Sequence, residues 1–114
     1  MTKSVFITGA SRGIGYHTAI LFAKNGYDIG FTYLKDDKKA DELFEIIKKF
    51  GVNIYKYKVD VKDYESMKNT LDDFVKNNKK IDNLICNAGI STYGTINEIS
   101  VDDIKNTIDT NIYG

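Results

Sequence analysis

The chain alternates four times between a short apolar run and a longer segment whose apolar residues recur at helical spacing. Short apolar runs that end at glycine or polar turn residues predict strands, and spacings of three and four residues predict helices. This order of strands and helices requires parallel strands joined by right-handed helical crossovers. The sequence therefore predicts an α/β fold with a parallel sheet. The strand-like runs lie at residues 4–8, 28–33, 53–59 and 81–86, and the helix-like segments begin near residues 13, 35, 63 and 100.

Each predicted helix has one apolar face, which is expected to pack against the sheet. The four faces consist of Ile14, Thr18, Leu21 and Phe22; of Ala40, Leu43, Ile47 and Phe50; of Tyr64, Met67, Leu71 and Phe74; and of Val101, Ile104, Ile108 and Asn111. Ser100 and Asp103 resemble a capping box, which predicts the start of the fourth helix.

The composition limits the kind of molecule and its partners. The length of 114 residues and the 42% of hydrophobic residues suit one globular domain, residues 1–114, with its own core. Sixteen basic side chains balance sixteen acidic ones, so no nucleic acid or anionic membrane is expected as a partner. Cys86 is the single cysteine, the start carries no apolar signal segment, and no apolar run approaches the ~20 residues of a membrane span. A cytoplasmic protein is expected.

Three glycines stand where the first strand passes into the first helix. Residues 8–15 read Thr-Gly-Ala-Ser-Arg-Gly-Ile-Gly. Gly9 would allow a tight turn, Gly13 a close approach of the backbone to a pyrophosphate, and Gly15 close packing of helix on sheet. The free N–H groups and the dipole of the first helical turn favour an anion there. An ordinary turn with incidental glycines is the alternative, but the flanking strand and helix favour a nucleotide site.

This loop resembles the cofactor loop of the short-chain dehydrogenase/reductase family, and within it the chain is most similar to the 3-oxoacyl-acyl-carrier-protein reductases. The resemblance covers the whole chain and implies a Rossmann-type, doubly wound parallel sheet with helices on both faces. The strand order would be 3-2-1-4, which is incomplete because the chain resembles the N-terminal part of a longer reductase. The cofactor-binding residues that the resemblance implies are Gly9, Ser11, Arg12, Gly13, Ile14, Gly15, Tyr33, Asp60, Val61, Asn87, Ala88 and Gly89.

Two further motifs match the family. Asp60 and Val61 follow the third strand, where the resemblance implies contact with adenine; an Asp60 that only caps the third helix is the alternative. Asn87, Ala88 and Gly89 close the fourth strand; the backbone there would run beside the nicotinamide ribose, and the Asn87 amide would brace the central strands. Cys86 is expected to be a small buried apolar side chain.

Asn111 places an amide at the end of the apolar face of the fourth helix. Burial of an amide is unfavourable without partners. The resemblance implies that Asn111 holds a water molecule in a catalytic proton relay. The alternative is an asparagine that merely stands where the helix ends.

The end of the second strand bears on the choice of dinucleotide. An NAD enzyme places Asp or Glu there to bind the ribose 2′-hydroxyl, whereas this chain has Tyr33. Arg12 is the only arginine of the chain, and its planar group can bind a 2′-phosphate. Asp36 and Asp37 are expected to begin the second helix, where acids suit the dipole. NADP(H) is therefore favoured over NAD(H).

The resemblance implies a catalytic Tyr, a Lys four residues later and a Ser, all beyond residue 114, so the chain alone is expected to be inactive. Tyr64 and Lys68 have the same spacing, but they lie on the third helix and are rejected as the catalytic pair. The implied substrate is a small carbonyl compound or alcohol, including one linked to acyl carrier protein, and the full-length protein is expected to form a dimer or tetramer.

Two other functions are compatible with parts of this sequence. A dinucleotide-binding module without chemistry, or a truncated fragment, would share every motif above. A phospho-receiver domain would fit the length and Asp60, but it needs acidic residues after the first strand to hold Mg²⁺. The chain has none there, so the receiver function is disfavoured.

Overall fold

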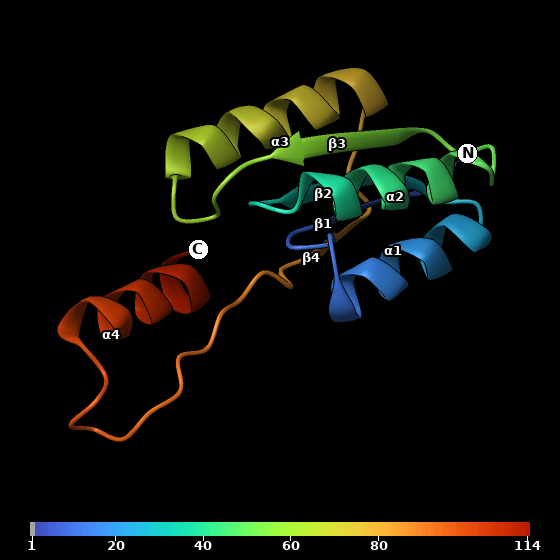
Figure 1. Cartoon of the computed structure of the whole chain (residues 1–114). Helices are drawn as coiled ribbons and strands as arrows, with labels where there is room; N and C mark the ends of the chain where they lie inside the picture. Colours follow the sequence, from blue (N-terminus) through green and yellow to red (C-terminus); the bar gives the residue numbers. More distant parts are fainter. Residues whose placement is uncertain (1) are drawn as a thin grey trace.

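The computed structural model describes residues 2–114 as a four-stranded parallel sheet with helices on both faces (Figure 1). The strand order is β3-β2-β1-β4, so the predicted fold class and strand order are confirmed. The strands are β1 (Ser4–Ile7), β2 (Asp28–Tyr33), β3 (Ile54–Lys58) and β4 (Asn83–Ile85). The helices are α1 (Gly13–Lys24), α2 (Asp37–Lys48), α3 (Tyr64–Asn78) and α4 (Val101–Ile108), and a π-helical turn, η1 (Asp109–Tyr113), follows α4 directly.

One face of the sheet packs against α3 through aromatic side chains. Phe6 on β1 and Tyr55 on β3 each meet the ring of Phe74 edge-on, with ring centroids 5.3 and 5.4 Å apart. Gly30 lies between them on β2, and a Cβ atom on it would come within 2.7 Å of the Phe74 ring. Glycine at this position therefore lets α3 lie close to the sheet.

The opposite face packs against α1 and α2. Strands alternate their side chains between the two faces, so the neighbours of Phe6 and Gly30 point to this side. The buried residues of this layer are Val5, Ile7, Ile29 and Phe31 from the strands and Ala19, Ala23, Ala40, Leu43 and Ile47 from the helices. The predicted core face of α2 is confirmed for its three helical members, whereas Phe50, beyond the helix end, is exposed.

The predicted core face of α1 is only partly confirmed, because Thr18 and Phe22 are partly buried whereas its other two members are exposed. Ile14 is 80% exposed and Leu21 is 61% exposed, whereas the buried residues of α1 are Gly15, Ala19 and Ala23. These small residues are four positions apart and form one face. A Cβ atom on Gly15 would lie 2.5 Å from Asn87 Nδ2 and 2.7 Å from the Gly9 carbonyl oxygen. The helix thus lies close to the sheet along this face, and larger side chains of α1 such as Ile20 and Phe22 pack against the core without full burial.

Residues 83–113 are less covered than the rest. The outer strand β4 borders only β1, and Leu84 on it is 53% exposed. Cys86 is exposed as well, so its predicted burial is wrong, because no further strand lies beyond β4 in the described chain. The predicted core face of α4 is also uncovered, with Val101 79% and Ile104 49% exposed. Figure 1 shows why: α4 lies at one end of the sheet and does not cover either face.

The first residue of α3, Tyr64, is exposed although its face was predicted to be core, because it precedes the part of the helix that lies over the sheet. The remaining members of that face, Met67, Leu71 and Phe74, are partly or fully buried. Ser100 and Asp103 form the predicted capping box of α4.

Candidate functional site

Hydrogen bonds from β4 fix the beginning of the glycine loop. The hydroxyl of Thr8 accepts from the backbone N–H groups of Asn87 and Ala88 at 3.1 and 3.0 Å. In return, Nδ2 of Asn87 donates to the carbonyl oxygens of Thr8 and Gly9 at 3.1 and 2.9 Å. The side chain of Asn87 thus braces the carboxyl ends of β1 and β4 against each other, in the way that the sequence predicts.

Gly9 turns the chain off β1 in a conformation that favours glycine. Its φ is +69°, and a Cβ atom on it would lie 2.7 Å from the Cα atom of Ala88. Its N–H donates to the hydroxyl of Thr32 on β2 at 3.1 Å, and the next residue, Ala10, donates to the carbonyl oxygen of Thr32 at 2.9 Å. The loop is therefore held by β2 on one side and by β4 on the other.

The amino end of α1 differs from the amino ends of the other helices. Asp36 caps α2, Asp63 caps α3, and Ser100 with Asp103 caps α4, each through side-chain oxygens. At α1 the cap position is Arg12, which makes no capping hydrogen bond, and the first turn contains no acidic residue. The first N–H groups of a helix require an acceptor, and they carry the positive end of the helix dipole. This end of α1 is thus suited to bind an anion.

Gly13, at the start of α1, leaves space above this helix end. Its φ is +62°, and a Cβ atom built on it would meet no atom within 4 Å. Gly9 and Gly15, in contrast, are each crowded by neighbouring backbone. Gly13 therefore permits the positive φ and leaves the backbone open to a ligand, whereas the other two glycines permit close packing of the backbone.

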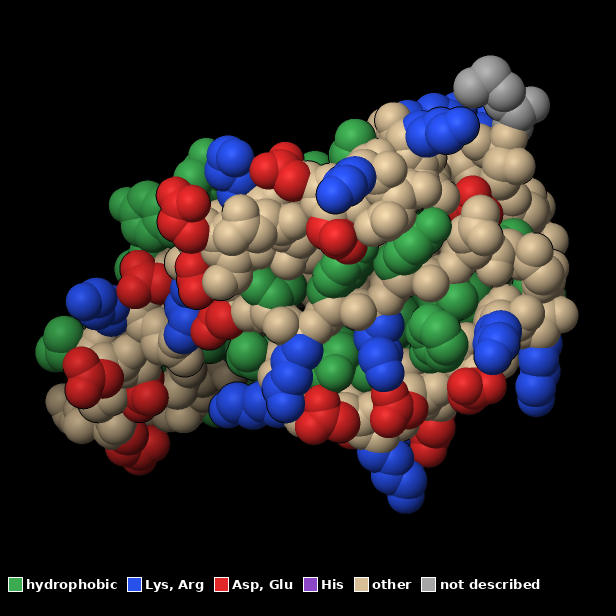
Figure 2. Space-filling view, turned by 90° about the horizontal axis from the view of Figure 1, so that it is seen from above, with side chains coloured by type: hydrophobic (Ala, Val, Ile, Leu, Met, Phe, Trp, Pro, Cys, Tyr) green, Lys and Arg blue, Asp and Glu red, His purple; other side chains and the backbone are tan. Residues whose placement is uncertain are grey.

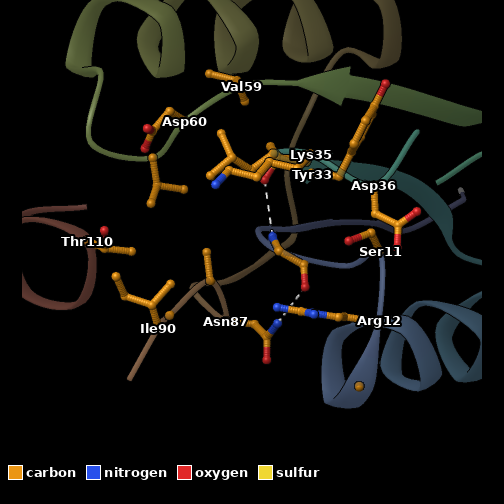
Figure 3. Close-up of a pocket in the computed structure, with 17 residues that line it drawn as sticks. Ser11, Arg12, Tyr33, Lys35, Asp36, Val59, Asp60, Asn87, Ile90 and Thr110 are labelled. Atoms are coloured by element: carbon orange, nitrogen blue, oxygen red, sulfur yellow. Dashed lines mark hydrogen bonds between the residues drawn. The ribbon is translucent and has the colours of Figure 1, made fainter. Parts of the chain in front are cut away.

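A groove of about 800 Å³ runs along the carboxyl ends of all four strands, within the usual size range of small-molecule sites. Figure 3 shows side chains from the loops that follow these strands, with Thr110 of η1 on one side and Arg12 near the start of α1. The lining residues are Gly9, Ser11, Arg12 and Gly13 after β1, residues 32–36 at the end of β2, residues 59–61 after β3, residues 87–90 after β4, and Thr110.

Most of the predicted cofactor-binding residues meet in this groove. Gly9, Ser11, Arg12, Gly13, Tyr33, Asp60, Val61, Asn87, Ala88 and Gly89 line it. Two predicted residues do not: the side chain of Ile14 points to solvent, and Gly15 is buried under the loop. The backbone of Ile14 nevertheless belongs to the uncapped first turn of α1.

The end of β2 combines a tyrosine with several charges. Burial raises the pKa of Tyr33, and a hydrogen bond to the Asp37 carboxylate raises it further. The pKa of Asp37 is lowered, mainly by its hydrogen bond from Lys58, whose Nζ lies 3.2 Å from Oδ1 of Asp37. Asp36 accepts from the N–H of Lys39 at 3.1 Å and caps α2, and Asp37 is the first residue of that helix. Both acids therefore begin α2, as the sequence predicts.

Asp60 lies on the groove wall and does not cap α3. The cap of α3 is Asp63, which accepts from the N–H of Ser66 at 3.1 Å and from its hydroxyl at 2.7 Å. Asp60 instead accepts from the backbone N–H of Lys62 at 2.9 Å. The alternative that Asp60 serves as the helix cap is therefore wrong.

Asn111 lies in the π-helical turn η1 rather than on the apolar face of α4. Its Oδ1 accepts from the N–H of Ile90 at 2.8 Å, and its Nδ2 donates to the carbonyl oxygen of Ile90 at 2.7 Å. The amide is exposed and bonded to backbone, so it is not a buried group on an apolar face. Asn111 does not line the groove itself, but its partner Ile90 and its neighbour Thr110 do.

Sequence reasoning missed Thr8, Thr32, Ile90 and Thr110. Thr8 and Thr32 are polar residues at the carboxyl ends of two buried strands, and in parallel sheets this edge carries the ligand site. That position was a usable signal for both. Ile90 and Thr110 have no comparable signal, because the loop after β4 and the turn η1 bring them to the groove.

Tyr64 and Lys68 lie outside the groove. Lys68 forms an ion pair with Asp72 on the same helix, with a distance of 3.2 Å between Nζ and Oδ2. Across residues 2–114 there is no cluster of metal-ligating side chains. No helix in this part of the chain has the length and apolar character of a membrane span.

Comparisons with known proteins agree with this geometry. A 3-oxoacyl-acyl-carrier-protein reductase from Staphylococcus aureus is 34% identical over 114 residues, which are 100% of this chain and 46% of that protein. An NADP(+)-dependent L-rhamnose 1-dehydrogenase from Thermoplasma acidophilum is 41% identical over 101 residues, 88% of this chain and 39% of that protein. A short chain dehydrogenase from Burkholderia cenocepacia, solved in complex with NADP, superposes with a TM-score of 0.93 at 31% identity and covers 97% of this chain and 45% of that one.

The chain thus spans about half the length of the curated relatives that it matches. Residues 3–114 match the sequence model of the short chain dehydrogenases. Together with the parallel sheet and the loop at the start of α1, this match shows that the chain belongs to the short-chain dehydrogenase/reductase family of oxidoreductases.

Proposed function

We propose that residues 1–114 form the cofactor-binding part of an NADP(H)-dependent oxidoreductase that transfers a hydride between the dinucleotide and a carbonyl compound or alcohol. The observation that carries this proposal is the uncapped amino end of α1, which opens into the groove at the carboxyl ends of the strands. The other three helices are capped by their own side chains. An external anion is therefore the partner that this helix end lacks.

The pyrophosphate would bind at the start of α1. Gly13 leaves the backbone accessible there, and the N–H groups of the first turn, including that of Ile14, would donate to phosphate oxygens. The hydroxyl of Ser11 lies on the same wall of the groove. Ala88 and Gly89, which line the groove after β4, would run beside the nicotinamide ribose.

A 2′-phosphate would bind between the glycine loop and the end of β2. Arg12 and Lys35 both line the groove, and Arg can bind a phosphate with two parallel hydrogen bonds. The position that carries an acid in NAD enzymes is Tyr33, and the nearby carboxylates of Asp36 and Asp37 are already engaged by α2 and by Lys58. These features support NADP(H) over NAD(H).

Asn111 would support the proton relay indirectly. Both polar atoms of its amide are bonded to the backbone of Ile90, so Asn111 would fix the loop after β4 beside the nicotinamide site. When bound, the dinucleotide supplies the hydride. The catalytic Tyr, Lys and Ser of the resemblance would come from further chain, and Tyr64 with Lys68 would not replace them.

The proposed substrate is a carbonyl compound or the corresponding alcohol. The name of the Staphylococcus aureus relative supports a carbonyl substrate, including an acyl group linked to acyl carrier protein. We propose that the full-length protein forms a homo-oligomer, either a dimer or a tetramer, and that it has no nucleic acid or membrane partner. We also propose a reducing, cytoplasmic environment, because Cys86 is the single cysteine and cannot form an internal disulfide.

The test is cofactor binding by the chain and by an Arg12→Met variant. Titration followed by calorimetry or NADPH fluorescence should show binding of NADPH to the chain. Loss of hydrogen bonds to a charged phosphate should weaken NADPH binding by roughly tenfold or more and leave NADH nearly unchanged. Lys24→Met, at the far end of α1, is the matched control. A chain that binds no nicotinamide dinucleotide contradicts the proposed function.

The alternative function is a dinucleotide-binding module without catalytic activity. An activity assay distinguishes this module from an oxidoreductase. We expect the 114-residue chain to bind NADPH without oxidising it in the presence of a 3-oxoacyl thioester. A longer gene product that carries a Tyr-x-x-x-Lys helix should do both. A longer product that lacks this pair, and binds NADPH without turnover, would favour the module.

A further inference from the structure

Lys62 contacts both oxygens of the Asp60 carboxylate. Its backbone N–H donates to Oδ1 at 2.9 Å, and its ammonium nitrogen lies 3.5 Å from Oδ2. Asp60 lines the groove, and both side chains are only about one-third exposed, 36% for Lys62 and 33% for Asp60. The ammonium group of Lys62 is therefore placed to restrict the orientation of a carboxylate on the groove wall.

The same ammonium group is held from the other side by α4. Nζ of Lys62 donates to Oδ1 of Asn106 at 2.7 Å. The chain near η1 approaches the same loop, because a Cβ atom on Gly114 would lie 2.7 Å from Cγ2 of Val61. Figure 1 shows the C-terminal end beside the loop between β3 and α3, and Figure 3 shows Asp60 on the side of the groove that carries Thr110.

We propose that Lys62, fixed by Asn106 of α4, is a positioning residue that orients Asp60 to accept a hydrogen bond from the exocyclic amine of adenine. This inference rests on the proposed function, since it assigns a role in recognition of the same dinucleotide. A carboxylate has about four lone-pair positions; the backbone N–H of Lys62 occupies one of them, and its ammonium nitrogen lies 3.5 Å from the other oxygen. The remaining positions are available to a ligand in the groove. A fixed acceptor there loses less conformational freedom on binding than a mobile one.

The test compares NADPH with its deaminated analogue, reduced nicotinamide hypoxanthine dinucleotide phosphate. The analogue replaces the donating amine by an accepting carbonyl oxygen, turns the neighbouring ring nitrogen from an acceptor into a donor, and keeps every phosphate, so only contacts with this edge of the base change. The 114-residue chain should bind NADPH about tenfold more tightly than the analogue, as expected for a hydrogen bond to a charged acceptor. In Lys62→Met, which keeps the apolar stem, this ratio should fall below about threefold through loss of NADPH affinity.

Three further variants make the result specific. Lys62→Arg should restore the ratio, because guanidinium keeps the charge and the donors. Asp60→Asn should invert the ratio, because an amide can donate to the hypoxanthine oxygen. Lys68→Met removes the charge from a matched Lys–Asp pair on the surface of α3 and should leave the ratio unchanged. Circular dichroism of each variant confirms that it is folded.

The outcomes separate this inference from the proposed function. Equal weakening of both dinucleotides in Lys62→Met would show a merely structural lysine and overturn the inference, and so would an unchanged ratio. Equal binding of both dinucleotides by the unmodified chain would overturn the role of Asp60 while leaving a dinucleotide site intact. Failure to bind either dinucleotide would overturn the proposed function, and the inference with it.

Discussion

Residues 2–78 and residues 83–114 are held in place by different interactions. In the first region, β1, β2 and β3 are enclosed by α1 and α2 on one face and by α3 on the other, and apolar side chains such as Phe6, Phe31 and Leu43 are completely buried. In the second, α4 and η1 bury no residue and are joined to the rest through hydrogen bonds such as those between Asn111 and Ile90. Figure 2 shows apolar side chains exposed among charged ones on the face seen from above.

This difference divides the groove into two parts. The side formed by the glycine loop and the end of β2 lies on the enclosed region, where close packing fixes the backbone. The side formed by residues 87–90 and Thr110 depends on a few polar contacts with β1 and η1. The first side should therefore tolerate loss of single hydrogen bonds, whereas the second should respond to each of them.

The largest expected effect tests the enclosed region. Phe74→Ala removes a fully buried ring that packs against Phe6 and Tyr55 and should lower the free energy of unfolding by about 3–5 kcal/mol. Ile104→Ala on the half-exposed face of α4 should cost less than about 0.5 kcal/mol. Urea unfolding followed by circular dichroism measures both. Similar losses in the two variants would contradict the division into two regions.

An intermediate effect is expected at the contact between η1 and the loop after β4. Asn111→Ala removes both hydrogen bonds to Ile90 and should reduce the free energy of local opening of α4 by about 1 kcal/mol, a roughly fivefold faster amide exchange. Amides of β2 should keep their protection. Asn77→Ala is the control, because its side chain bonds only to a carbonyl of its own helix. Faster exchange of β2 in Asn111→Ala would show that the regions open together.

The smallest expected effect is a dependence on pH. Asp82, before β4, accepts from the N–H of Ser4 on β1 at 2.7 Å, and this bond lowers the pKa of Asp82 below its ordinary value of 3.8. A lowered pKa in the folded state stabilises the protein above pH 3.8, and this contribution disappears as the pH falls through the folded-state value. Asp82→Asn should therefore lose less stability than the unmodified chain between pH 4 and pH 2. Urea midpoints across this range measure the difference, and parallel curves would contradict the role of Asp82.

The alternation of strands and helices predicted the parallel sheet, and the resemblance to a known family implied the strand order and most of the groove residues. The position of Gly9 and Gly13 after an apolar strand predicted a loop that lines the groove, and the spacing of Ala40, Leu43 and Ile47 predicted a core face. The core face of α1 was predicted only in part, because large apolar residues such as Ile14 mark a core face in the sequence whereas close packing here selects Gly15 and Ala19.

The remaining differences arise from contacts between distant residues. The burial predicted for Cys86 assumed neighbours on both sides of β4, but β4 is the outer strand of the described sheet. The π-helical turn that contains Asn111 has no signature in helical periodicity, so its bond to Ile90 was not foreseen. Lys62 lies two residues after Asp60 in the sequence, but its contacts with the Asp60 carboxylate and with Asn106 appear only in the fold.

The small-residue face of α1 has a consequence for the way this site can change over time. Because Gly15, Ala19 and Ala23 set the distance between helix and sheet, any larger side chain at these positions would shift the whole helix and carry its amino end away from the groove. If the proposed phosphate site is correct, substitutions more than one helical turn from it would change cofactor affinity without touching the ligand.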